Sequence, residues 1–211
     1  MTESQAHGFT WETFIKESIY KVADKASYTR KNDIDSNENT IDNCAVSIKT
    51  SGSVSVDMGD ARRIFQGTSS GEPLRMILIQ YTQDETYKNL KAVLEVDLTG
   101  AWQELFGDVT YEEISRFHET LKEIPAGQVK NKDYLTISDS LNMRMGALSV
   151  RPKVDSKNQR RLQCSFKNID DFCQIYPGRL LYKNTEGVLK GMQIVTSILS
   201  GRRIRHPRLH V

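Results

Sequence analysis

Residues 39–53 read NTIDNCAVSIKTSGS and place Asp42 ahead of a strand-like run that ends in Lys49. Alternate side chains of a strand share a face, so Ser47 and Lys49 point one way while the apolar residues between them point into a core. Asp42 is out of phase with Lys49 and converges on it only if the chain bulges or twists near Asn43. Phosphodiester hydrolysis needs an oxygen ligand for Mg²⁺, an activated water and a cation beside the scissile phosphate, and these residue types supply such groups.

The segments around this motif predict an alternation of helices and strands. Helical spacing of apolar residues predicts helices over 10–26, 59–67 and 110–124, and runs of β-forming residues predict strands over 40–50, 73–83 and 88–100. In the second helix, Asp60 lies near the start and Gly67 is expected to end it.

The last third of the chain is expected to be mostly extended. A loop and a short strand are predicted over 125–138, two extended segments over 140–166 around a basic turn, and a strand with a short helix over 180–195. The whole chain, 1–211, is predicted to be one domain of the α/β or α+β class, with a central mixed sheet flanked by helices.

The ordered motifs resemble a known nuclease superfamily. D…SIKTSGS, the apolar strand RMILIQY, and the later segments DYLTISDSLNMRM and PKVDSKNQRRLQCSF are similar to the PD-(D/E)xK superfamily, and within it to type II restriction endonucleases, over roughly residues 10–166. The resemblance implies a restriction-endonuclease-like fold and Mg²⁺-dependent, sequence-specific cleavage of double-stranded DNA. Cutting both strands of a symmetric site is simplest for a homodimer.

The resemblance also implies a role for each motif residue. Lys49 would be the motif lysine, which holds the attacking water or stabilises charge on the phosphate, and Asp42 would be the metal-binding aspartate. Ser47 stands where the family usually has Asp or Glu, and a serine binds metal only weakly or through water. A further ligand must therefore come from elsewhere, and Glu12 on the first helix is the candidate for this catalytic and metal-binding role.

Other carboxylates remain open as alternatives. Asp33 and Asp35 are alternative first acids, because their separation from the Ser47–Lys49 pair suits a hairpin. Glu95 and Asp97 share one face of a strand and could bind Mg²⁺, or they could pair with nearby lysines on a solvent-facing surface.

Basic residues in two places predict contacts with DNA. Arg62 and Arg63 fall in the first turn of a helix, where the helix dipole favours a phosphate. The segment 151–166 and the tail 201–211 are rich in Lys, Arg and Gln, which neutralise phosphates and read base edges. In the segment, the predicted DNA-contacting residues are Lys153, Lys157, Gln159, Arg160, Arg161 and Gln163.

The composition and the motifs that are missing argue against several other kinds of site and partner. The net charge is only +2, and three cysteines without a CxxC disfavour a disulfide framework and structural zinc. No phosphate-loop, dinucleotide-binding or serine-hydrolase motif occurs, so no nucleotide cofactor is expected. Without a signal peptide or a long apolar run, the chain is expected to be soluble and cytoplasmic, with no membrane partner.

Two alternatives to a nuclease remain. With Ser47 in place of an acid, the chain could be a non-catalytic DNA- or RNA-binding module on a degenerate nuclease fold. It could also be an interaction domain without any role in nucleic-acid binding. Salt sensitivity of DNA binding separates these two, since affinity that depends on phosphate contacts falls steeply as salt rises.

Overall fold

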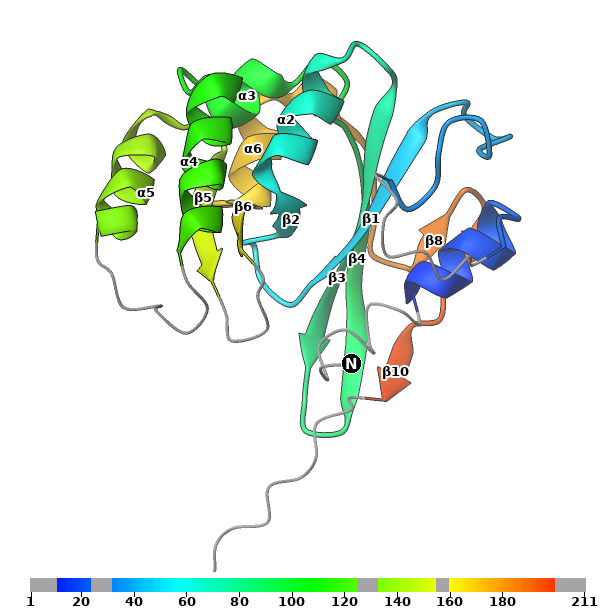
Figure 1. Ribbon diagram of the computed structural model, residues 1–211. Coiled ribbons are helices and arrows are strands. Elements are labelled where there is room, and N and C mark those ends of the chain that lie inside the picture. The colour runs from blue at the N-terminus through cyan, green and yellow to red at the C-terminus, as the bar shows by residue number, and fades with distance from the viewer. Residues whose placement is uncertain (1–10, 24–31, 125–132, 155–159, 200–211) are drawn as a thin grey trace, which may run out of the picture.

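The computed structural model describes residues 11–23, 32–124, 133–154 and 160–199 (Figure 1). It is a mixed α+β fold in which a curled central sheet is flanked by helices, as the sequence predicted. The helices are η1 (Ile15–Ile19), α2 (Ala61–Ser69), α3 (Trp102–Phe106), α4 (Tyr111–Glu123), α5 (Asp133–Arg144), α6 (Ile169–Ile175) and η2 (Pro177–Arg179). The strands are β1 (Ala45–Ser51), β2 (Asp57–Asp60), β3 (Leu74–Gln83), β4 (Tyr87–Asp97), β5 (Leu148–Val154), β6 (Arg160–Phe166), β7 (Leu180–Asn184), β8 (Val188–Leu189), β9 (Met192–Gln193) and β10 (Ser197–Leu199).

The central sheet, here called sheet A, has the strand order β1-β3-β4-β10, with β7 also paired to β4. Strand β1 runs parallel to β3, and β3 runs antiparallel to β4. Parallel neighbours need a crossover connection, and β2 and α2 lie in the connection between β1 and β3. The crossover therefore places the start of α2 close to sheet A.

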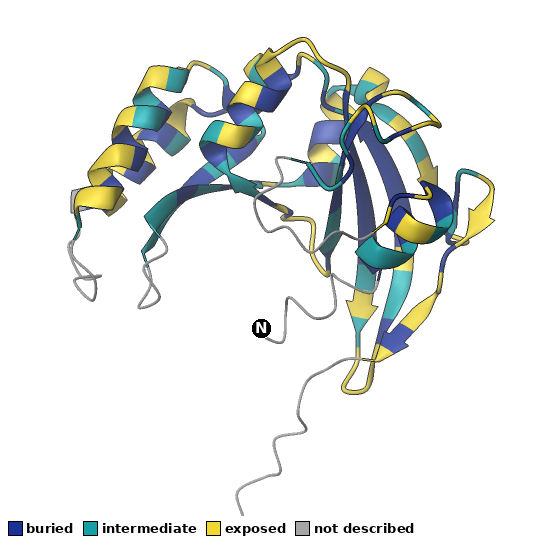
Figure 2. Cartoon of the chain, turned by 45° about the vertical axis from the view of Figure 1, so that its right-hand side comes forward, coloured by how far each residue is buried: buried dark blue, intermediate teal, exposed yellow. Residues whose placement is uncertain are grey.

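Sheet A separates two apolar cores. Along β1, Ala45 faces a helix-side core that includes residues of α2, α4 and α6, whereas Val46 and Ile48 face an N-terminal core built around Trp11 and Ile15. The helices α2–α6 lie on one side of β1, β3 and β4, and η1 and β8 lie on the other (Figure 1). The middle of sheet A is buried on both faces (Figure 2).

A second sheet, here called sheet B, has the order β2-β6-β5 and is antiparallel. Helix α4 packs on β6 and helix α5 packs on β5, so one face of sheet B belongs to the helix-side core. Leu162, Cys164 and Phe166 of β6 point to that face and are fully buried. The other face carries the alternate residues and is only partly covered.

Most elements of the first two thirds of the chain are confirmed. Strands β3 and β4 and helix α4 match their predicted segments, and Asp60 caps α2 by accepting hydrogen bonds from two backbone amides. Gly67 does not end α2, because the helix continues to Ser69 with Gly67 packed near Leu74. The first helix ends earlier than expected, at Ile19, and the chain is left-handed at Lys21.

The last third departs further from expectation. Residues 133–144 form helix α5 where a loop, a short strand and the start of an extended segment were predicted. The short helix expected within 180–195 is instead the β8–β9 hairpin, and α3 and α6 were not predicted at all. The paired extended segments β5 and β6 are confirmed.

A close backbone crossing joins α3 to the end of α5. Gly107 is left-handed, with φ 59°, and the amide of Ala147 donates to the carbonyl of Glu104 at 2.9 Å. A Cβ atom on Gly146 would overlap the Glu104 carbonyl oxygen, so no side chain fits at this position. This crossing fixes where β5 begins, and so where sheet B lies.

We expect Gly146→Ala to lower the free energy of unfolding by about 3 kcal/mol, because the backbone must shift to admit the methyl group. Chemical denaturation measures this change. Gly178→Ala is the matched control, since its Cβ meets nothing within 4 Å, and its effect should stay within about 0.5 kcal/mol. Equal stability of the two variants would contradict the close crossing.

Candidate functional site

Asp33 and Lys49 meet at the edge of β1 that lies away from β3. Ile34 forms a bridge with Val46, with the Val46 amide donating to the Ile34 carbonyl at 2.8 Å, and this places Asp33 alongside the strand. One Asp33 carboxylate oxygen, Oδ2, accepts the Ile48 amide at 2.6 Å and lies 3.7 Å from Lys49 Nζ. The acid beside the lysine is therefore Asp33, which the sequence offered only as an alternative.

Ser47 belongs to the same group. Its hydroxyl donates to Asp33 Oδ2 at 3.4 Å, and it shares with Lys49 the face of β1 that looks toward the helix-side core. The side chains of Lys49 and Asp33 are 23% and 26% exposed. Both groups therefore remain accessible to a bound molecule while being held by the strand.

Glu12 adds a second carboxylate. It stands in the helical residues 11–14 that lead into η1, and Lys16 Nζ lies 2.5 Å from its Oε1. Burial raises the pKa of Glu12 and the negative charge of Asp33 raises it further, while Lys16 and Lys49 act in the opposite direction. The charges of Asp33 and Lys49 therefore reach Glu12.

A cavity of about 710 Å³, here called the cleft, opens at Asp33 and Lys49. Asp33, Ser47 and Lys49 line it on the side of β1, and Gly59 and Asp60 line it on the side of β2. The remaining polar walls include Arg62, Arg63, Gln66, Tyr111 and Arg161. Three arginines and a lysine around a polar cavity favour an anionic occupant.

Arg62 and Arg63 line the cleft, but their backbone amides are already used. Asp60 Oδ1 already accepts the amides of Arg62 at 3.0 Å and Arg63 at 3.2 Å. The Asp60 carboxylate therefore already occupies the positive end of α2, where the sequence predicted that a phosphate would bind. Any phosphate at this end of the cleft would meet guanidinium groups first.

The partly covered face of sheet B continues the basic wall. In register, Lys153 lies opposite Arg161 and Arg151 lies opposite Gln163, and the alternation of β5 and β6 puts all four on the face away from the helices. Arg161 also lines the cleft, so this face and the cleft are continuous.

Not all of the predicted DNA contacts share that face. Arg160 alternates with Arg161 and therefore points to the opposite face of sheet B. Gln163 hydrogen-bonds the Asp57 carboxylate, so part of its capacity to read a base is already used. Lys157, Gln159 and the tail 201–211 lie outside the described residues.

Asp42 is not beside Lys49, which corrects the expected convergence. Asn39 Oδ1 accepts the Asp42 amide at 3.1 Å, and Asn43 is left-handed with φ 52°, so the turn before β1 directs Asp42 toward Arg75. Arg75 is in register with Val46 and lies on the N-terminal-core face of sheet A. Asp42 and Lys49 therefore occupy opposite faces of the sheet.

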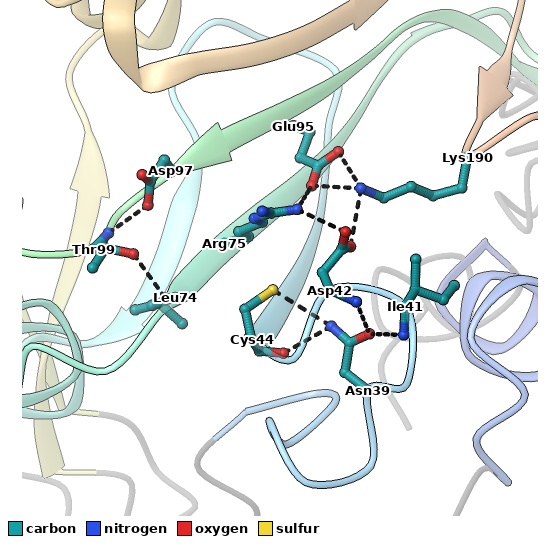
Figure 3. A network of polar contacts seen from close by, with 10 residues as sticks. All are labelled: Asn39, Ile41, Asp42, Cys44, Leu74, Arg75, Glu95, Asp97, Thr99 and Lys190. Carbon is teal, nitrogen blue, oxygen red and sulfur yellow. Dashed lines mark hydrogen bonds and ion pairs between the residues drawn. The ribbon is translucent and has the colours of Figure 1, made fainter.

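Asp42 instead joins a compact charge network (Figure 3). Arg75 lies 3.1 Å from Asp42 and 2.8 Å from Glu95, and Lys190 lies 3.0 Å from Asp42 and 2.9 Å from Glu95. Each carboxylate meets both cations, and the four formal charges cancel. Burial alone would lower the pKa of Lys190, but hydrogen bonds to Glu95 and Asp42 outweigh it and raise that pKa.

The alternative acidic pair is not a metal site in this arrangement. Glu95 is only 4% exposed and is occupied by the network, while Asp97 Oδ1 accepts the Thr99 amide at 2.9 Å and stabilises the turn after β4. Asp35 also lies apart from Lys49, where its side chain accepts a hydrogen bond from Asn32.

Asp33 lines the cleft and could hold a metal there, whereas Glu12, the predicted second ligand, is not among the lining residues and pairs with Lys16. Among the described residues, no three His, Cys, Asp or Glu side chains form a group that could bind a metal. Mg²⁺ is usually held by one or two protein carboxylates together with waters and phosphate oxygens, so Asp33 beside Lys49 could supply one of its ligands. Asp33 does not provide a complete ligand set from protein alone.

Comparisons with protein-family models, characterised proteins and solved structures find no match for this chain. The likeness to restriction endonucleases therefore remains a prediction from sequence motifs. No described helix is long and apolar enough to cross a membrane.

We expect Asp33→Asn to lower the pKa of Glu12, because the substitution removes a neighbouring negative charge that raises it. A side-chain carboxyl NMR titration of Glu12 measures the change. Asp97→Asn is the control, because Asp97 is not among the groups that act on Glu12. An unchanged Glu12 pKa in Asp33→Asn would show that the charge of Asp33 does not act on Glu12.

We expect Lys190→Met to lower the free energy of unfolding by about 3 kcal/mol, since it leaves the buried Glu95 and the partly buried Asp42 sharing one cation. Lys183→Met is the matched control, because Lys183 forms an exposed pair with Asp170 at 3.8 Å, which should contribute less than about 1 kcal/mol. Thermal and urea unfolding of both variants would reveal the difference, and equal losses would refute the network's structural role.

Proposed function

We propose that the chain is a Mg²⁺-dependent endonuclease that hydrolyses phosphodiester bonds of double-stranded DNA at specific sequences, in the manner of type II restriction enzymes. The observation that carries this proposal is the meeting of Asp33, Ser47 and Lys49 in a cleft with arginine side chains in its walls. It is supported by the motif resemblance, with Asp33 in place of Asp42 as the first acid.

The side chains divide the chemistry between them. Asp33 would hold the metal ion, which when bound would polarise the phosphate and lower the pKa of a coordinated water. Lys49 supplies a positive charge and hydrogen-bond donors for the attacking water or the developing charge on phosphorus. The Ile48 amide fixes Asp33, so the acid is already oriented before DNA arrives.

The basic walls account for substrate binding. Arg62, Arg63 and Arg161 border the cleft, and Lys153 extends the positive charge along sheet B. These groups suit contacts with the phosphates on either side of a scissile bond. Double-strand cleavage of a symmetric site would be achieved by two copies of the chain related by a two-fold axis.

A second candidate is a DNA- or RNA-binding module without catalysis. Two observations favour it: Ser47 occupies the position of the family's middle acid, and the Asp33 oxygen nearest Lys49 already accepts the Ile48 amide and the Ser47 hydroxyl. In that case the cleft would bind phosphates with no metal-dependent step.

The test is digestion of unmethylated phage DNA by wild type, Lys49→Ala and Asp33→Asn, each with Mg²⁺ and with EDTA. We expect discrete fragments from wild type with Mg²⁺ only, and rates lowered at least about 100-fold in both variants. Lys91→Ala is the matched control, an exposed lysine on β4 outside the cleft, and it should cut like wild type.

Each other outcome selects a different conclusion. Cleavage that survives Lys49→Ala would refute the assignment of the site. A salt-sensitive gel shift without cleavage by wild type would favour the binding module. Circular dichroism of every variant confirms that lost cleavage is not lost folding.

A further inference from the structure

A buried histidine stands directly behind one of the cleft arginines. His118 of α4 is 4% exposed, and its Nε2 lies 2.8 Å from a terminal nitrogen of Arg62. Arg62 lines the cleft with its side chain 27% exposed, so it joins the buried histidine to the cavity. Neither the resemblance nor the proposed mechanism uses this histidine.

The geometry determines the protonation state of His118. A guanidinium can only donate hydrogen bonds, so Nε2 of His118 must accept from Arg62 and the imidazole must be neutral with its proton on Nδ1. Nδ1 lies 3.6 Å from Asp60 Oδ2 and has no hydrogen-bond partner among the described residues. A second proton on the ring would remove the acceptor and place two cations in contact.

The surrounding charges support the neutral form. Burial lowers the pKa of His118, the Arg62 charge lowers it further, and Lys122 acts in the same direction. The charges of Asp60 and Glu119 raise the His118 pKa, but by less than the other groups lower it. Protonation therefore takes place below the ordinary histidine pKa of about 6.5.

We propose that His118 is a positioning residue that holds Arg62 against the cleft for phosphate binding and releases it when the imidazole is protonated. Arg62 is otherwise held by Glu119 at 2.9 Å, an exposed pair that cannot fix it alone. The proposal rests on the proposed function in one respect, that the anion in the cleft is a nucleic-acid phosphate. Its consequence is that Arg62 contributes less to phosphate binding once the His118 imidazole is protonated.

The test measures binding of a fluorescent DNA duplex in EDTA, so that cleavage plays no part, at pH 7.5 and at a pH below the His118 transition that NMR titration finds. At pH 7.5, Arg62→Gln should weaken binding about tenfold, the loss expected for one charge-assisted hydrogen bond. Below that transition the same substitution should change binding less than about twofold, because protonated His118 no longer positions Arg62. The ratio of the wild-type affinity to the Arg62→Gln affinity at each pH removes the general effect of acid on DNA binding.

His118→Gln provides the rescue, since a glutamine oxygen can accept from Arg62 but cannot be protonated. In that background Arg62→Gln should weaken binding about tenfold at both pH values. Two results would overturn the proposal. One is that the effect of Arg62→Gln on binding depends on pH in the same way with His118 present as in the His118→Gln background. The other is that Arg62→Gln has no effect on binding in either background.

NMR titration of His118 in wild type and in Arg62→Gln measures the pKa of the same imidazole in both proteins, without any substitution of the buried histidine. The His118 pKa should rise when the neighbouring cation is removed, and an unchanged pKa would overturn the proposal. If no variant binds the duplex, the nucleic-acid function fails, and this titration alone then decides whether His118 and Arg62 are coupled.

Discussion

The pairing of β1 on both of its edges is the constraint on which the rest of the structure depends. Strand β3 holds one edge in parallel register, and the Asp33–Ile34 segment holds the other through the bridge to Val46 and the Ile48 amide. Because each face of β1 enters a different apolar core, a slip of one residue would bury Lys49 and expose Ile48 to the cleft. The same pairing therefore fixes both the register of β1 and the positions of Lys49 and Asp33 in the cleft.

Acidic side chains are paired differently on the two faces of sheet A. On the N-terminal-core face, Asp42 and Glu95 each meet both Arg75 and Lys190, so every charge is compensated by protein. In the cleft, Asp33 lies 3.7 Å from Lys49, its one ion-pair partner among the described residues, and outside the cleft lining burial and the charge of Asp33 raise the pKa of Glu12. Perturbed and incompletely paired acids are typical of functional sites, whereas closed networks are typical of structural ones.

The sequence predicted the parts of this arrangement that depend on local pattern. The alternation along β1 placed Ser47 and Lys49 on one face, and the apolar runs located β3 and β4. The choice between Asp33 and Asp42 depends on a turn whose direction is set by Asn39 and by a left-handed residue, which no alternation encodes. Helix α5 was missed because its buried stripe includes a polar residue, Ser138, whose hydroxyl donates to the Val150 carbonyl, while its apolar Leu135 and Ile137 are exposed.

The bond between Asp33 and a backbone amide has an evolutionary consequence. Every residue type but proline offers that amide, and the acid is located by strand-edge pairing rather than by the length of chain between it and the lysine. The turns that follow Ile34 could gain residues at small entropic cost without moving either group. Proteins that share this site therefore need not share its acid-to-lysine spacing, and a search with a fixed interval would pass over them.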